Sequence, residues 1–245
     1  MTPVEGQWED KRLTMMGHLE ELRQRLIKTL VAVGVTTAFS FLFARQVFLL
    51  LKTRAEGVEL IYTEVPEMLG TYFKVAFVSG LVLAMPVIVY QIVMFVAPAL
   101  TPKEKRYLYL LLPGVFLSFV TGAAFAFFVV IPPALGFLLS FGGDIARPQI
   151  KVGNYVSVVT NLLFWIGVAF ETPLIIFFLA KIRVIKPGLL SRYRKYAVVA
   201  SFVAAALITP TPDPINQALV AVPIMALYEA GVWLAKLAWR GIPQE

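Results

Sequence analysis

Long runs of apolar residues set the strongest limit on what this chain can fold into. A helix that crosses a bilayer needs about 20 predominantly apolar residues, within a range of about 17–25. Four segments meet this requirement, at residues 27–43, 68–96, 108–130 and 156–180. Hydrophobic residues make up 59% of the chain and charged residues only 15%, which is too few to cover a soluble globule. The sequence therefore predicts an all-α integral membrane protein.

Two more apolar stretches follow, separated by the motif TPTPDP. Its three prolines cannot lie inside a regular helix, so we expect a short fifth helix at 196–208 and a short sixth helix at 215–237. The fifth is shorter than a bilayer-spanning helix, so it should thin the membrane locally or pack behind longer neighbours. The prediction is one polytopic domain, residues 1–245, with six transmembrane helices.

The basic residues indicate how these helices are oriented. Cytoplasmic loops carry an excess of lysine and arginine. The loop KIRVIKPGLLSRYRKY holds six basic residues and no acid, and further basic residues lie before the first helix and between the second and third. We therefore expect both termini to be cytoplasmic, with a retained first helix and no cleaved leader.

Prolines in or beside the predicted helices favour kinks. A kinked bundle with a concave face is one outcome, and a convex bundle with incidental kinks is the other. Proline alone does not choose between them.

Several functional classes find no support in the composition. The chain has no cysteine and one histidine, His18, so no thiolate or multi-histidine metal site can form. No serine-histidine arrangement or aspartate pair indicates an enzyme, and no cofactor is expected. The net charge of +7 is explained by basic loops that orient the chain, so nucleic acid is not an expected partner.

Acidic residues within the apolar segments are the first functional candidates, because a carboxylate in hydrocarbon is costly and normally faces a cavity or a partner. Glu171 lies in GVAFETPLI, near the middle of the fourth segment, without a nearby lysine or arginine. It is either a contact or proton site, or a structural group bonded to a neighbouring helix or to carbonyls beside Pro173. Glu229 is near enough to the end of its helix to be reached by Lys236 or by water, so a structural role fits it at least as well as a functional one.

Two polar clusters border the first three segments. Glu21 and Arg25 in EELRQR have the i,i+4 spacing of a helical ion pair, so a solvated helix is one reading of that cluster. In TPKE, Thr101, Pro102 and Glu104 have the pattern of a helix N-cap, a proline in the first turn and a capping box.

Several motifs, in order along most of the chain, resemble the TatC family of the twin-arginine protein translocase. These are HLEELRQRL, PVIVYQIVMFVAPALTPKEKR, FAFFVVIPPALGFLL, GVAFETPLI and RKYAVVASFVAAALITPTPDPINQ. The resemblance implies a receptor that binds twin-arginine signal peptides of folded cargo and nucleates a translocase driven by the proton-motive force. Carried over by motif, Glu21, Glu104, Arg23 and Phe95 would form the signal-peptide site.

The resemblance also implies the partners and location of the chain. Glu171 would be an intramembrane contact, and Asp213 and Gln217 would lie where a partner helix docks on the fifth helix. The expected partners are single-span TatA- and TatB-type proteins, further copies of the chain and membrane lipid, in the inner membrane of a prokaryote. A proton-coupled transporter using Glu171 and a structural scaffold stay open as alternatives.

Overall fold

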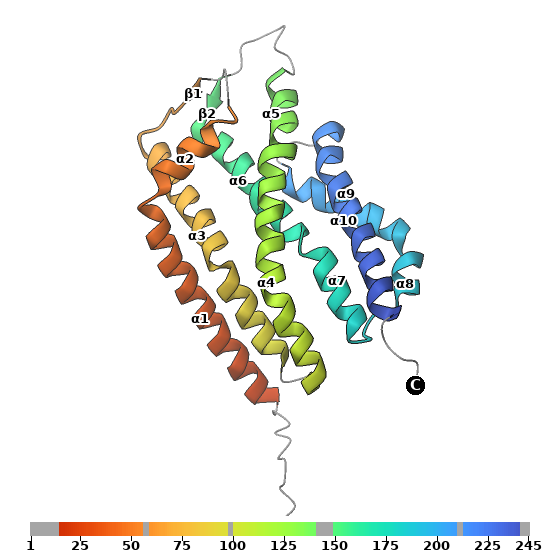
Figure 1. Cartoon of the computed structure of the whole chain (residues 1–245). Helices are drawn as coiled ribbons and strands as arrows, with labels where there is room; N and C mark the ends of the chain where they lie inside the picture. The colour runs from red at the N-terminus through yellow and green to blue at the C-terminus, as the bar shows by residue number, and fades with distance from the viewer. Residues whose placement is uncertain (1–14, 56–58, 98–99, 141–148, 210–212, 241–245) are drawn as a thin grey trace, which may run out of the picture.

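The computed structural model describes residues 15–55, 59–97, 100–140, 149–209 and 213–240, and within them the chain is almost entirely helical (Figure 1). The elements run α1 (Met15–Phe41), α2 (Ala44–Lys52), β1 (Leu60–Ile61), α3 (Val65–Val96), α4 (Pro102–Phe125), the π-helical turn η2 (Ala126–Val130), α5 (Ile131–Ser140), β2 (Ile150–Lys151), α6 (Val152–Ala169), α7 (Thr172–Lys181), α8 (Pro187–Arg192), α9 (Arg194–Ile208) and α10 (Pro214–Arg240).

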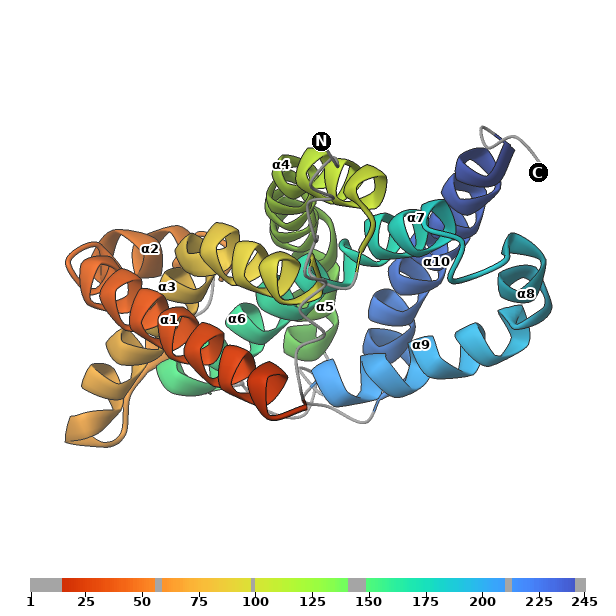
Figure 2. The same ribbon diagram turned by 90° about the horizontal axis from the view of Figure 1, so that it is seen from below.

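The helices are arranged as an extended row, which is clearest when the molecule is viewed along its long axis (Figure 2). Helix α1 packs along α3, α3 and α4 both pack on α6, and α7 connects them to α10, against which α9 lies. Helix α6 is at the centre, and its side chains Val156, Val159, Leu162 and Ile166 are fully or almost fully buried. The main apolar core is therefore built around α6.

Four helical segments of the described part are long and apolar enough to cross a bilayer: Val65–Val96, Glu104–Leu138, Val152–Lys181 and Pro214–Trp239. The pair α1 and α2 qualifies as a fifth segment, although the two helices are bent by 73° at Phe41–Ala44. Helix α9 has 15 residues, or about 22 Å, and is shorter than the roughly 30 Å hydrocarbon core. The chain is a multi-pass membrane protein by these criteria.

The structure corrects three sequence-based expectations about helix lengths. In the described part of the chain the first helix begins at Met15 and not at residue 27, because the charged motif continues the helix as polar turns. The third apolar segment extends through η2 and α5 to Ser140. The sixth helix is not short: α10 has 27 residues, and Pro223 lies inside it without ending it.

The fourth predicted helix, 156–180, is divided into α6 and α7. The break lies at Phe170 and Glu171, directly before Pro173 in the first turn of α7. Proline lacks the N–H that would donate to the carbonyl four residues earlier, so the hydrogen-bond ladder is interrupted there. The break places Glu171 at the N-cap position of α7, in the middle of the apolar segment.

Helices α1 and α3 approach closely at Gly80. A Cβ atom added there would lie 2.6 Å from the Cα of Thr37 and 2.7 Å from its backbone nitrogen. The Thr36 hydroxyl donates a hydrogen bond to the Gly80 carbonyl across the same crossing, at 2.8 Å. Small residues permit such backbone approach between membrane helices, so Gly80 fixes the position of α1.

Candidate functional site

A polar cluster joins α1 to the last turns of α3, and we call His18, Glu21, Arg25, Gln91 and Phe95 the Glu21 cluster. Oε1 of Glu21 accepts hydrogen bonds from Nε of Arg25, at 2.9 Å, and from its Nη2. Nη1 of Arg25 also lies 3.5 Å from the amide oxygen of Gln91. The His18 ring stacks on Phe95 with centroids 4.4 Å apart. The predicted Glu21–Arg25 ion pair is therefore confirmed, and it also bridges two helices.

The two oxygens of Glu21 have different environments. The side chains of Glu21 and Arg25 are only 20% and 18% exposed. Oε2 lies 3.8 Å from Nδ1 of His18 and makes no hydrogen bond within the described part of the chain, although it is buried. An unsatisfied buried carboxylate oxygen is costly, so Oε2 is suited to accept a further donor.

Arg23 is not part of the Glu21 cluster. Its side chain is 71% exposed and lies 3.6 Å from Glu20, on the outer surface of α1. Such an exposed pair contributes little to stability.

Glu104 forms the predicted capping box at the start of α4, and this prediction is confirmed. Its Oε2 accepts hydrogen bonds from the backbone N–H of Thr101, at 2.7 Å, and from its hydroxyl, at 2.8 Å. The Thr101 hydroxyl in turn accepts from the backbone N–H of Glu104, at 3.4 Å. Both capping bonds to the carboxylate end on Oε2, so the cap fixes the carboxylate and leaves Oε1 for another donor.

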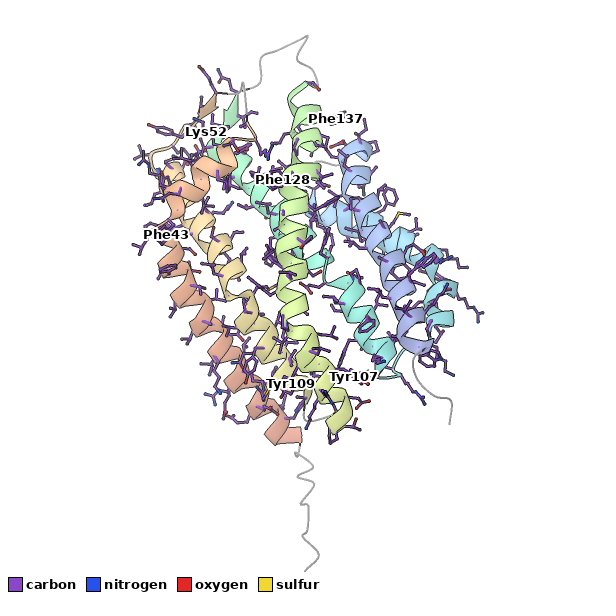
Figure 3. The ribbon with its side chains drawn as sticks, in the orientation of Figure 1. Phe43, Lys52, Tyr107, Tyr109, Phe128 and Phe137 are labelled. Atoms are coloured by element: carbon purple, nitrogen blue, oxygen red, sulfur yellow. The ribbon has the colours of Figure 1, made fainter. Side chains whose placement is uncertain are left out.

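Aromatic side chains hold this end of α4 against its neighbours. The Tyr109 hydroxyl lies 3.3 Å from the sulfur of Met94 in α3. The ammonium of Lys181, at the end of α7, lies 5.0 Å from the ring centre of Tyr107. Figure 3 shows Tyr107 and Tyr109 at the end of the molecule from which α1 begins. The Glu104 cap therefore lies at the end of the molecule from which α1 begins, as the Glu21 cluster does.

Glu171 is separate from this end. It is 6% exposed, and neither carboxylate oxygen has a hydrogen-bond partner among the described residues. Its side chain makes no N-cap hydrogen bond to the backbone N–H groups of α7. A partner could contact this carboxylate only after the surrounding side chains had moved.

Asp213 and Gln217 lie at the start of α10. Oδ1 of Asp213 accepts from the backbone N–H of Asn216 at 2.7 Å, and Oδ2 accepts from its side-chain amide at 3.0 Å. These bonds give Asp213 the role of a helix cap. The side-chain amide of Gln217 donates to the Phe202 carbonyl at 3.0 Å and so connects α10 to α9. Gln217 also lines an apolar groove of about 480 Å³ along α9.

Two further acids have partners that the sequence did not indicate. Glu229 pairs with Arg194 of α9, at 2.8 Å, and the expected contact with Lys236 is wrong. Glu67 accepts hydrogen bonds from the backbone N–H groups of Thr63 and Gly153, at 2.9 and 3.2 Å. The bond from Gly153 joins the two segments whose strands, β1 and β2, pair in parallel. Long-range partners of this kind leave no local signal in a sequence.

Comparisons with known proteins agree on one family. A family model described as Sec-independent protein translocase protein (TatC) matches residues 17–223. The Sec-independent protein translocase protein TatC of Carboxydothermus hydrogenoformans is 40% identical over 93% of this chain and 95% of its own length. The TatC protein of Aquifex aeolicus is 42% identical over 91% and 95%. A crystal structure of the twin-arginine translocase receptor TatC has a TM-score of 0.81 and 41% identity, covering 90% of this chain and 99% of that one.

Proposed function

Because this chain belongs to the TatC family of Sec-independent protein translocase proteins, we propose that it is the receptor subunit that binds twin-arginine signal peptides. The match to a solved receptor over nearly its whole length is the observation that carries the proposal. It favours this function over a proton-coupled transporter or a structural scaffold. The family forms part of a translocase and is not an enzyme family, and we propose no reaction for the chain.

The signal-peptide site proposed for this receptor consists of Glu21, Glu104, Arg23 and Phe95. Two guanidinium groups are best recognised by two separately positioned carboxylates, because each can accept paired, charge-assisted hydrogen bonds. Glu21 already accepts a guanidinium from Arg25 on one oxygen, which supports a site for arginine here. Oε2 of Glu21 and Oε1 of Glu104 would accept the arginines of the signal peptide.

Phe95 and Arg23 would act beside these carboxylates. The stacked rings of Phe95 and His18 form an apolar wall next to Glu21, suited to the aliphatic stem of an arginine. Arg23 is exposed and would tune the charge of the surface across which the peptide approaches.

The proposed topology has six spans with both termini in the cytoplasm of a prokaryote, and a concave face. The basic loop between α7 and α9 supports this orientation. Helix α9 would be the short fifth span. Because the chain has no cysteine, single introduced cysteines can be labelled from either side of the inner membrane without background.

The proposed partners are single-span TatA- and TatB-type proteins, together with further copies of this chain. The outer face of α9 supports a docking role, because Val199, Val203 and Leu207 are 62%, 56% and 83% exposed. Gln217 borders the same groove and Asp213 caps the helix that carries it. Glu171 would contact a partner helix within the membrane.

A peptide-binding experiment tests the receptor function. Purified protein in nanodiscs would be titrated with a labelled twin-arginine signal peptide and with its twin-lysine counterpart. Glu104→Gln is a suitable variant because glutamine also satisfies a capping box, so the charge is lost while the helix start is kept. Glu21→Gln is its equivalent in α1, and Glu20→Gln is the control on the same helix.

Loss of one charge-assisted pair costs about 1.5–3 kcal/mol, or tenfold or more in affinity. We expect Glu21→Gln and Glu104→Gln to lose this much affinity for the twin-arginine peptide and Glu20→Gln to bind normally. Equal binding of both peptides to every variant would refute the receptor function assigned to these residues.

A further inference from the structure

An apolar groove of about 600 Å³ lies at the end of the molecule opposite the Glu21 cluster. We call it the α2–η2 groove, because Phe43, Val47 and Leu51 line one side and Phe127 and Phe128 the other, with Val82 of α3 between them. Figure 3 shows Phe43 and Phe128 at this end. Its volume falls within the range of about 300–1,000 Å³ that is typical of ligand sites.

Arg54 lies directly over two of the rings that line this groove. Its guanidinium carbon is 4.3 Å from the ring centre of Phe127 and 4.9 Å from that of Phe128. Arginine on aromatic faces is stabilised by cation–π attraction, which also keeps it in a fixed orientation. The groove therefore has a positively charged group at one edge.

Among the described residues, this arginine has no anionic partner. Within the described part of the chain no carboxylate lies within 4.0 Å of Arg54, and its Nε is buried without a hydrogen-bond acceptor. The Tyr155 hydroxyl donates to the Leu51 carbonyl at 2.6 Å. A partly buried cation without a counter-charge is unfavourable, so an external anion would stabilise it.

The bend and the burial pattern of α2 indicate that Arg54 lies at the level of lipid head groups. Helix α2 is bent by 73° from α1, buries Ala44, Phe48 and Leu51, and leaves Leu49 and Leu50 about half exposed. A helix of this kind lies in the membrane interface, with basic residues at the level of the head groups. Arg54 follows α2 by two residues and therefore shares this level.

We propose that the α2–η2 groove binds an anionic glycerophospholipid, with one acyl chain in the groove and the phosphate on Arg54. The apolar lining suits an acyl chain, and the planar guanidinium suits a phosphate that accepts two hydrogen bonds. A zwitterionic lipid is less suitable, since its ammonium group would lie close to the positively charged guanidinium of Arg54. The site is far from the Glu21 cluster, so it is independent of signal-peptide recognition.

Native mass spectrometry of the full chain, released from micelles with added phosphatidylglycerol or phosphatidylcholine of the same acyl chains, tests the site. We expect one tightly held phosphatidylglycerol, bound about tenfold more strongly than phosphatidylcholine. Arg54→Gln should abolish this preference. Arg45→Gln removes the same charge from the exposed start of α2 and should retain the preference. Ala124→Trp fills the groove and leaves Arg54 in place. It should weaken phosphatidylglycerol binding at least as much as Arg54→Gln does.

Equal affinity of wild-type protein for the two lipids would overturn the proposal, as would an unchanged preference in Arg54→Gln. Displacement of the lipid by glycerol phosphate alone would also contradict it, because an anion site would then exist without an acyl-chain site. If Arg54→Gln does not fold, Arg54→Lys keeps the charge without the planar fork. This variant should show a reduced preference, and wild-type preference would count against the proposal.

Discussion

The close approach of α1 and α3 at Gly80 predicts that Gly80→Ala destabilises the protein. The new Cβ would lie 2.6 Å from the Cα of Thr37, about 0.8 Å short of the 3.4 Å at which ordinary contact begins. The Thr37 hydroxyl oxygen would be 2.5 Å away, but the other two clashing atoms belong to the Thr37 backbone, so no rotamer change relieves the clash and the helices must separate. Overpacking of this kind costs about 1–3 kcal/mol.

The same separation should weaken signal-peptide binding. Arg25 and Gln91 are already at the limit of a hydrogen bond, 3.5 Å, so a shift of α1 by a fraction of an ångström breaks their contact. Loss of one contact that contributes about 1.4 kcal/mol to binding reduces the affinity for the peptide tenfold. Binding of the twin-arginine peptide to Gly80→Ala in nanodiscs should therefore fall by up to this factor.

Gly70→Ala is the matched control, since it lies on the same helix and a Cβ there meets nothing within 4 Å. Alanine stabilises a helix interior by about 0.5–1 kcal/mol relative to glycine. Unfolding in detergent, followed by circular dichroism against denaturant, should show the two variants shifted in opposite directions. A Gly80→Ala protein as stable as Gly70→Ala would refute the argument from helix approach.

Three further predictions concern single contacts. Tyr155→Phe removes the hydrogen bond to the Leu51 carbonyl and should lower the free energy of unfolding by about 0.5–1.5 kcal/mol; an unchanged value would mean that α2 is not held by this bond. Arg194→Gln breaks a half-exposed pair with Glu229 and should change that free energy by less than about 1 kcal/mol; a larger loss would reveal a buried pair. Glu171→Met removes a buried carboxylate without a partner and should stabilise the protein by about 1–3 kcal/mol while impairing cargo transport in cells; a lower unfolding midpoint would show that the carboxylate is paired.

Features encoded locally were predictable from the sequence. The capping box of Glu104 and the ion pair of Glu21 with Arg25 follow from residue types three and four apart, and both are present. The long apolar segments likewise gave the positions of the main helices, because hydrophobic length determines whether a helix can cross a bilayer.

Features that depend on contacts between distant segments were not predictable. The pairing of Glu229 with Arg194 joins two helices, and nothing near Glu229 in sequence identifies that partner. The hydrogen bond from Gly153 to Glu67, across 86 positions, could not be predicted for the same reason. The break before α7 had a visible cause in Pro173, but proline is tolerated inside α3, α4 and α10, so proline alone does not locate a break.

A double-mutant cycle between receptor and peptide tests the central claim most directly. Wild type, Glu21→Gln and Glu104→Gln would each be titrated with peptides in which either arginine is replaced by lysine. If each carboxylate binds one arginine, a glutamate variant and the lysine peptide that break the same pair should together cost much less binding free energy than the sum of their separate costs. The coupling expected is about 1.5 kcal/mol or more, assigning one arginine to each glutamate. Costs that add within about 0.5 kcal/mol for every combination would show that neither carboxylate contacts the arginines, and would contradict the account.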